Sequence, residues 1–351
     1  MPPFVNQGLV ETPMRRLAIL VTMLGLLAMC IPEGTASPEA RAQGVLLVAN
    51  KGDETLGIVD PGAGQQIAIV AEGGTTGHEV AASPDGHTAY VPIYGNSGVG
   101  KPGTDGRNMI VVDIASRKVV GNVDFGHGVR PHCAAFGPKD RMLYVTTELD
   151  KTISIIDPRT LKIVGSIPTG QPESHMLAIT ADGERGYTAN VGPGTVSVLD
   201  MENRKTIAVI PVAGVVQRIA LTPDGKMAFT SNQTKPQLAV IDTASNKVKT
   251  WIPLPAAGYG TAPTPDGRWL VVAVPSAKKV AVVDLGAMKV AQVLDVPASP
   301  QEVLMRPDGQ VAYVSCDASH KIAEIRTSNW TVAKLIDAGP GADGLAWAGR
   351  E

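Results

Sequence analysis

The chain has 351 residues and a formal net charge of −2 at pH 7, with 44% hydrophobic and 18% charged residues. This balance fits a compact globular protein and argues against nucleic acid as a partner, because neutralising phosphates takes clustered lysines and arginines. The 38 glycines and 27 prolines predict many tight turns.

Residues 1–42 read as an export signal. An Arg-Arg pair precedes the apolar stretch 17–31, and the sequence ARA at 40–42 matches an A-x-A cleavage site. The apolar stretch is short for a membrane span, which needs about 20 residues. We therefore expect a cleaved signal peptide, with Met14 as an alternative start, and a periplasmic or secreted mature protein without a membrane span.

From residue 44 onward one pattern returns at a nearly constant interval. It is a short hydrophobic run followed by an Asp-Gly turn, as in GHEVAASPDG from Gly77, SHMLAITADG from Ser174 and PQEVLMRPDG from Pro300. Successive copies lie 54, 43 and then 42 residues apart. A fixed repeat of this length is typical of a closed array rather than of two independent domains.

Each repeat divides into four short strands, which we call A to D. In the copy around His175 the expected strands are 176–180, 185–190, 195–200 and 206–211. Four antiparallel strands per unit are typical of a propeller blade. On strand C, apolar residues such as Val196 and Val198 alternate before a terminal aspartate, which places them on one sheet face against the next blade.

Counting the strands predicts seven blades. The segments 45–50, 54–59 and 66–71 supply strands B, C and D without an A, whereas 344–348 supplies an A alone. Pairing of this C-terminal strand with the N-terminal strands would close the ring and remove its free edges. The sequence thus predicts an all-β, seven-bladed β-propeller as the single domain of residues 43–351, with Trp347 in the core.

Three runs resemble a known repeat: SPDGHTAYV from Ser83, KDRMLYVTTELDKTISIID from Lys139 and RPDGQVAYVSC from Arg306. They are similar to the YVTN-type repeat of secreted and periplasmic seven-bladed propellers, the family that includes the YncE-like proteins. The resemblance covers essentially all of residues 44–348 and implies the seven-bladed fold. It implies no activity, because this fold serves scaffolds, lyases, lactonases and electron-transfer partners alike.

Strand order predicts which loops share a face. Every B–C loop and every D–A link should lie on one side, the top face, and the A–B and C–D turns on the other, the bottom face. Seven ring residues precede the innermost strands and should surround the mouth of the axial channel: His78, His132, His175, Gln217, Tyr259, Gln301 and Asp343. The one long insertion, the loop 93–107, should overhang this mouth.

Three histidines from consecutive blades give the sharpest functional hypothesis. His78, His132 and His175 could bind a transition metal such as zinc or copper, because imidazole is the commonest ligand for such metals and three ligands leave one position open. Glu173 or Glu79 would then orient an imidazole or act as the general base of a lyase or hydrolase.

The other polar residues of the top face are expected to bind the ligand, which we take to be a small polar molecule. Arg130 and Arg218 would bind a carboxylate or phosphate. The rest of the expected ligand-binding set is Gln217, Tyr259, Gln301, Glu302 and Asp343.

Simpler interpretations remain open beside the hypothesis of a metal or ligand site. The ring positions could be polar only because they face a water-filled channel, and the protein could be a monomeric scaffold that binds another protein at its top face. Glu148 and Asp150 read as solvated turn residues, and Cys133 and Cys316 as buried thiols that do not pair with each other.

Overall fold

The computed structural model describes residues 1–4, 43–212 and 214–349. The expected signal peptide lies almost wholly outside these residues, so export and the domain boundary stay predictions. Within the described ranges, no helix is long and apolar enough to cross a membrane. The chain divides into the units Met1–Thr35 and Ala36–Glu351, and all strands belong to the second.

Seven four-stranded antiparallel sheets form the described part of that unit, and each sheet is one blade. Blade one contains β4 (Ala81–Ala82), β5 (Thr88–Gly95), β6 (Asp105–Asp113) and β7 (Lys118–Asp124). Blade two contains β8 (Pro131–Phe136), β9 (Leu143–Thr147), β10 (Thr152–Asp157) and β11 (Lys162–Pro168). Blade three contains β12 (Ser174–Ile179), β13 (Arg185–Asn190), β14 (Thr195–Asp200) and β15 (Lys205–Pro211).

The remaining blades repeat this order. Blade four contains β16 (Ala220–Leu221), β17 (Met227–Asn232), β18 (Gln237–Asp242) and β19 (Lys247–Pro253). Blade five contains β20 (Thr261–Pro263), β21 (Trp269–Val274), β22 (Lys279–Asp284) and β23 (Lys289–Asp295). Blade six contains β24 (Pro300–Met305), β25 (Val311–Cys316), β26 (Lys321–Arg326) and β27 (Thr331–Asp337). Two short 3-10 turns, Pro275–Ala277 and Asp317–Ser319, follow β21 and β25.

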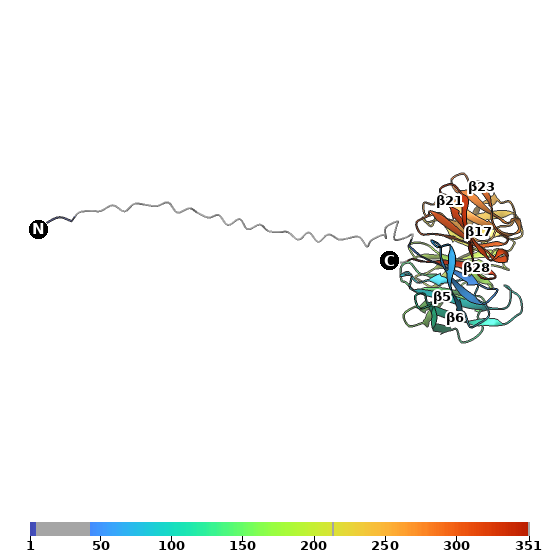
Figure 1. The fold of residues 1–351 in the computed structure, drawn as a ribbon, viewed down its shortest axis with the longest axis horizontal. Helices are drawn as coiled ribbons and strands as arrows, with labels where there is room; N and C mark the ends of the chain where they lie inside the picture. The colour runs from blue at the N-terminus through green and yellow to red at the C-terminus, as the bar shows by residue number, and fades with distance from the viewer. Residues whose placement is uncertain (5–42, 213, 350–351) are drawn as a thin grey trace. The chain divides into compact units, whose positions relative to one another are not determined.

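Blade seven closes the ring as predicted. It consists of β28 (Ala342–Gly349), β1 (Gly44–Asn50), β2 (Thr55–Asp60) and β3 (Gln65–Ala71), with β28 paired to β1 (Figure 1). The innermost strand of every blade contacts that of the next, and β28 contacts β4. Trp347 is half-buried rather than fully buried, and its ring stacks on Tyr313 with the planes 9° apart.

The predicted core lies between the blades. Val196 and Val198 of β14 have no exposed surface and pack with Ala228, Ala239 and Ile241 of blade four. Comparable apolar clusters occur at the other blade interfaces, because each sheet face is covered by the next blade.

Backbone hydrogen bonds place the loops on the faces as predicted. On the top face, the D–A link after β11 bonds to the B–C loop after β9, because Thr169 N donates to Lys151 O at 2.9 Å. On the bottom face, the C–D turn of blade three bonds to its A–B turn through Met201 N and Glu184 O at 3.1 Å. All the ring residues therefore share the top face.

Candidate functional site

The ring residues lie at the inner ends of the blades on the top face. His132 is in β8, His175 in β12, Gln301 in β24 and Asp343 in β28, whereas His78, Gln217 and Tyr259 lie just ahead of β4, β16 and β20. His132, His175 and Asp343 are buried, and the other four are half-buried. The channel mouth is therefore lined by a partly exposed polar layer with a buried polar layer beneath it.

The three histidines pack with Tyr94 as one aromatic cluster. The ring centroids of His132 and His175 lie 3.5 Å apart with the planes 31° apart, and His78 meets His132 edge to face at 5.5 Å. Tyr94, at the end of β5, is fully buried, and its ring lies 5.0 Å from that of His78. The histidines thus come together as expected, but in a stacked arrangement.

This stacking does not support the expected metal site. Among the described residues, no group of three or more His, Cys, Asp or Glu side chains is arranged to hold a metal ion. Two imidazoles on one tetrahedral ion would have their centroids roughly 5 Å apart, because each nitrogen lies ~2.1 Å from the metal and the ligands diverge. His132 and His175 are closer and nearly face to face, so their lone pairs do not point at one common position.

Burial keeps the histidines neutral. It lowers the pKa of His78 to about 4, and it lowers the pKa values of His132 and His175 well below the usual range. Nearby Arg218 lowers all three further, because a second positive charge disfavours the imidazolium. At neutral pH each ring is therefore a hydrogen-bonding group without charge.

A chain of two glutamines fixes the tautomer of His175. Gln233 Nε2 donates to Gln217 Oε1 at 3.0 Å, and Gln217 Nε2 donates to His175 Nε2 at 2.9 Å. The proton of His175 is then on Nδ1, which has no hydrogen-bond partner among the described residues. Nδ1 of His132 likewise has none there.

Glu148 is part of this site and not a solvated turn residue. Only 2% of it is exposed; Tyr94 Oη donates to its Oε2 at 2.5 Å, and the Gly100 N–H donates to its Oε1 at 3.3 Å. The prediction was wrong because the long blade-one loop covers this position. Burial raises the pKa of Glu148, although the hydrogen bond from Tyr94 and the charge of Arg130 lower it in part.

Arg130 ties the long loop down over the mouth. Its Nε donates to Asp105 Oδ1 at 2.6 Å, its Nη2 donates to Lys101 O at 2.7 Å, and its Nη1 lies 3.5 Å from Glu148 Oε1. Because two carboxylates already lie beside it, Arg130 anchors the loop 96–104 and is not a free cation for an anionic ligand.

Glu173, an expected base, lies at the rim of the mouth. It is half-buried and its Oε2 accepts a hydrogen bond from the Gly192 N–H at 2.6 Å. A side chain on Gly100 would come within 2.6 Å of its Oε1. Glu173 thus sits between the long loop and the B–C loop of blade three, and Glu148 is the carboxylate near His175 Nδ1, at 4.0 Å.

Arg218 fills the centre of the buried layer. It is 3% exposed and reaches three other blades: Nη1 donates to Glu79 Oε1 at 2.5 Å and to Glu302 Oε2, and Nη2 donates to Asp343 Oδ1 at 3.2 Å. The ring of Tyr259 lies 4.8 Å from its guanidinium carbon. The expected anion-binding arginine and the expected base Glu79 therefore bind each other.

Lys51 extends the charged cluster toward the surface. Its Nζ lies 3.1 Å from Asp343 Oδ2 and 2.9 Å from Asp317 Oδ2. Burial alone would lower the pKa of Lys51, but the two carboxylates outweigh it and raise the pKa. The side chain of Gln301 makes a local hydrogen bond, because its Nε2 donates to Ser299 Oγ at 2.9 Å.

The residues that sequence reasoning missed share one repeat position. At the end of strand B in each blade come Lys51, Tyr94, Glu148, Val191, Gln233, Pro275 and Asp317, which we call the second ring. Tyr94 is the last residue but one of β5, and the other six directly follow their strands. Except for the proline, the N–H of each donates to the carbonyl two residues before a ring residue. Their spacing repeats the intervals of the first ring, so the same periodicity could have found them.

Both described cysteines are buried and free. Burial raises the pKa values of Cys133 and Cys316 to about 12, so neither is a thiolate at neutral pH. The prediction that they do not form a disulfide is confirmed.

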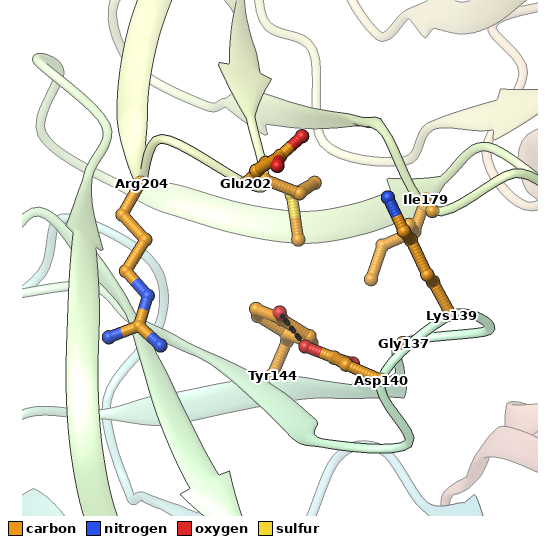
Figure 2. Close-up of a pocket in the computed structure, with 9 residues that line it drawn as sticks. Gly137, Lys139, Asp140, Tyr144, Ile179, Glu202 and Arg204 are labelled. Atoms are coloured by element: carbon orange, nitrogen blue, oxygen red, sulfur yellow. Dashed lines mark hydrogen bonds between the residues drawn. The ribbon is translucent and has the colours of Figure 1, made fainter.

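Cavities also lie between neighbouring blades on the bottom face. In one of about 230 Å³, between blades two and three, Lys139 and Arg204 lie on opposite sides of Tyr144, which donates to Asp140 Oδ2 at 2.7 Å (Figure 2). Similar cavities lie at four other blade interfaces. A groove that recurs round the ring follows from blade packing and does not by itself mark a specific site.

Comparison with known proteins shows the fold alone. No protein-family model matches the chain, and no curated protein matches it. The structure is similar to hydrazine synthase from Kuenenia stuttgartiensis, with a TM-score of 0.63 and 18% identity over 77% of this chain and 89% of that one. It is also similar to the dihydro-heme d1 dehydrogenase NirN in complex with DHE, with a TM-score of 0.64 and 16% identity over 91% and 77% of the two chains. These structures support the seven-bladed propeller, and membership of the YVTN-type family stays a prediction.

Proposed function

We propose that the chain is an exported propeller that binds a small, uncharged polar molecule at the channel mouth, beneath the loop 96–104. The observation that carries the proposal is the pair of buried, neutral imidazoles of His132 and His175, whose Nδ1 atoms have no partner among the described residues. A buried polar atom left unpaired costs about 1–3 kcal/mol, and a position that served only packing would favour an apolar side chain.

The charges of the mouth favour an uncharged ligand over the carboxylate or phosphate first expected. Arg130, Arg218 and Lys51 are each held by carboxylates of the protein itself. An anion would therefore meet paired cations and surplus carboxylates. The half-buried His78, Gln217 and Gln301 offer hydrogen bonds without charge, and Tyr259 adds an aromatic ring.

The structural neighbours agree with this proposal only in outline. The dihydro-heme d1 dehydrogenase was solved in complex with DHE, so a protein of similar fold holds a small molecule. At 16% identity the comparison carries over the fold and not the ligand.

A metal-independent lyase or hydrolase is the second candidate. The observation in its favour is that Tyr94, Glu148 and the neutral His175 lie together beside the mouth. Such groups take part in general acid–base catalysis once a substrate is in reach.

Nuclear magnetic resonance of the imidazole side chains tests the ligand site. The protein is titrated with a panel of uncharged hexoses, polyols and lactones and with their carboxylate analogues. We expect uncharged members to shift the signals of His78, His132 or His175 and to leave those of the exposed His87, His127 and His320 unchanged.

A glutamine pair provides the matched control. Gln217→Ala removes the hydrogen bond to His175 and should abolish the shifts, whereas Gln310→Ala at an exposed bottom turn should not. Shifts confined to the three exposed histidines, or shifts that survive Gln217→Ala unaltered, would contradict a site at the mouth.

A further inference from the structure

Glu79 and Glu302 bind the same nitrogen atom. Both accept hydrogen bonds from Arg218 Nη1, which has only two hydrogens, so each glutamate takes one and their carboxyl groups lie side by side. Their side chains are 7% and 17% exposed, so water screens them little. Two carboxylates held this closely cannot both ionise without a large penalty, as in the paired aspartates of aspartic proteases.

A charge count gives the number of protons that the cluster needs. Arg218 and Lys51 bring two positive charges, and Glu79, Glu302 and Asp343 bring three carboxyl groups. Asp343 contacts both cations, whereas the two glutamates meet one nitrogen atom of Arg218. If all three carboxyl groups were ionised, these five side chains would carry a net negative charge, and one proton on the two glutamates removes it. Asp317, the second partner of Lys51, lies outside this count because its side chain is 26% exposed and water screens its charge.

We propose that Glu79 and Glu302, which both bind Arg218, share one proton between their carboxyl groups. A carboxylic acid and a carboxylate then lie side by side at the floor of the channel mouth. A protonated glutamic acid still accepts the Arg218 N–H through its carbonyl oxygen, so the added proton does not break the contact. Glu302, the more exposed member, is the one that a molecule in the mouth can reach.

The pair gives the proposed ligand site an acid–base function, and this consequence rests on the proposed function. A ligand oxygen beside Glu302 would receive the shared proton and leave two carboxylates on Arg218, and a proton from water would restore the pair. The proton-sharing itself depends only on the protein and can be measured without any ligand.

The side chains around the two glutamates do not supply a further positive charge that could take the place of the shared proton. Burial raises the pKa values of both glutamates, Arg218 lowers them in part, and Asp343 raises them again. The other titratable or charged side chains near the cluster are His78, His132, His175, Cys133, Tyr259, and Lys51 with its second partner Asp317. The three histidines are neutral at neutral pH. Lys51, the one further cation beside the cluster in the described part of the chain, is engaged by two aspartates.

Infrared spectroscopy with ¹³C-labelled glutamate tests the inference directly. At pH 7 we expect one carboxylic-acid carbonyl band of the wild type to disappear in Glu79→Gln and the same band to disappear in Glu302→Gln. Either change leaves a single carboxyl group on Nη1, which then ionises. Glutamine keeps the carbonyl that accepts from Arg218, so both variants should fold.

A matched variant controls for other buried acids. Glu72→Gln alters a buried glutamate elsewhere on the top face, whose pKa burial raises to about 7. This variant should keep the shared band. A wild type without this band, or a band lost in only one of the two glutamate variants, overturns the proton-sharing and leaves the ligand proposal to its own imidazole test.

Discussion

The two faces of the propeller use the same repeat in opposite ways. On the bottom face one contact recurs in six blades: an aspartate of the A–B turn accepts a hydrogen bond from the N–H two residues later, at 2.9–3.1 Å. On the top face the seven ring residues include three histidines, two glutamines, a tyrosine and an aspartate. Uniform residues serve an architecture that every blade shares, so the varied ring indicates a task that only the whole ring performs.

The two faces also differ in how far their stabilising contacts reach between blades. A bottom turn is complete within one blade, since Thr222 and Asp224 bond to each other and to the same turn. At the top, Arg218 of blade four holds carboxyl groups of blades one, six and seven. Changes at the top should therefore act across the ring, and changes at the bottom should stay local.

The largest effect is expected from Arg218→Met. It leaves three buried carboxyl groups without their shared cation, so the free energy of unfolding at pH 7 should fall by about 3–5 kcal/mol. At pH 5 the loss should be smaller, because the glutamates can take up protons. Denaturant unfolding at both pH values measures this.

Arg159→Met is the matched control. Arg159 is 81% exposed and, among the described residues, pairs only with Asp157 of its own bottom turn, so its removal should leave the free energy of unfolding nearly unchanged. Equal losses from both arginine variants would break the distinction between the two faces.

A second effect is the loss of stability at acidic pH. The pKa values of His78, His132 and His175 are lower in the folded chain than in the unfolded one. Their contribution to the free energy of unfolding is therefore fully present above about pH 6.5 and is lost as the pH falls toward 4. At pH 5 each buried imidazole should lower the free energy of unfolding by about 2 kcal/mol relative to pH 7. His132→Leu should therefore lose about 2 kcal/mol less than the wild type between pH 7 and 5. The exposed His320→Leu should track the wild type, and a His132→Leu profile parallel to the wild type would refute the assignment.

The smallest effect is expected from Asp224→Ala on the bottom face. It removes the hydrogen bonds from Thr222 Oγ1 at 2.7 Å and Lys226 N at 3.1 Å, so we expect a loss of about 1 kcal/mol. The imidazole signals of the mouth should not move. Movement of the His175 signal in this variant would show that the two faces are coupled.

Much of this architecture could be predicted because it repeats. The predicted strands 185–190 and 195–200 match β13 and β14, and the closing pair of β28 and β1 followed from leftover strands. The meeting of the three histidines followed from their shared repeat position. Their stacking did not, because ring orientation depends on side chains packed around them, including Tyr94.

The partners of the ring were harder to predict. Single-residue chemistry suggested that Arg218 and Arg130 face a ligand. Two of their carboxylate partners, Asp105 and Glu79, lie 25 and 139 residues away along the chain. Glu148 looked like a turn residue because only the folded long loop buries it. The second ring shows that a periodic signal for Glu148 and Tyr94 was present at the end of each strand B.

A crystallographic fragment screen tests the central claim most directly, because it maps binding sites before any ligand has been identified. Crystals are soaked with a library of small polar fragments, and occupied positions are compared between the channel mouth and the bottom cavities. The account predicts that fragments gather at the mouth, in contact with His78, Gln217 or Tyr259, and that this density is lost in Gln217→Ala. Fragments that bind only in the bottom cavities, such as the one beside Tyr144, would contradict it.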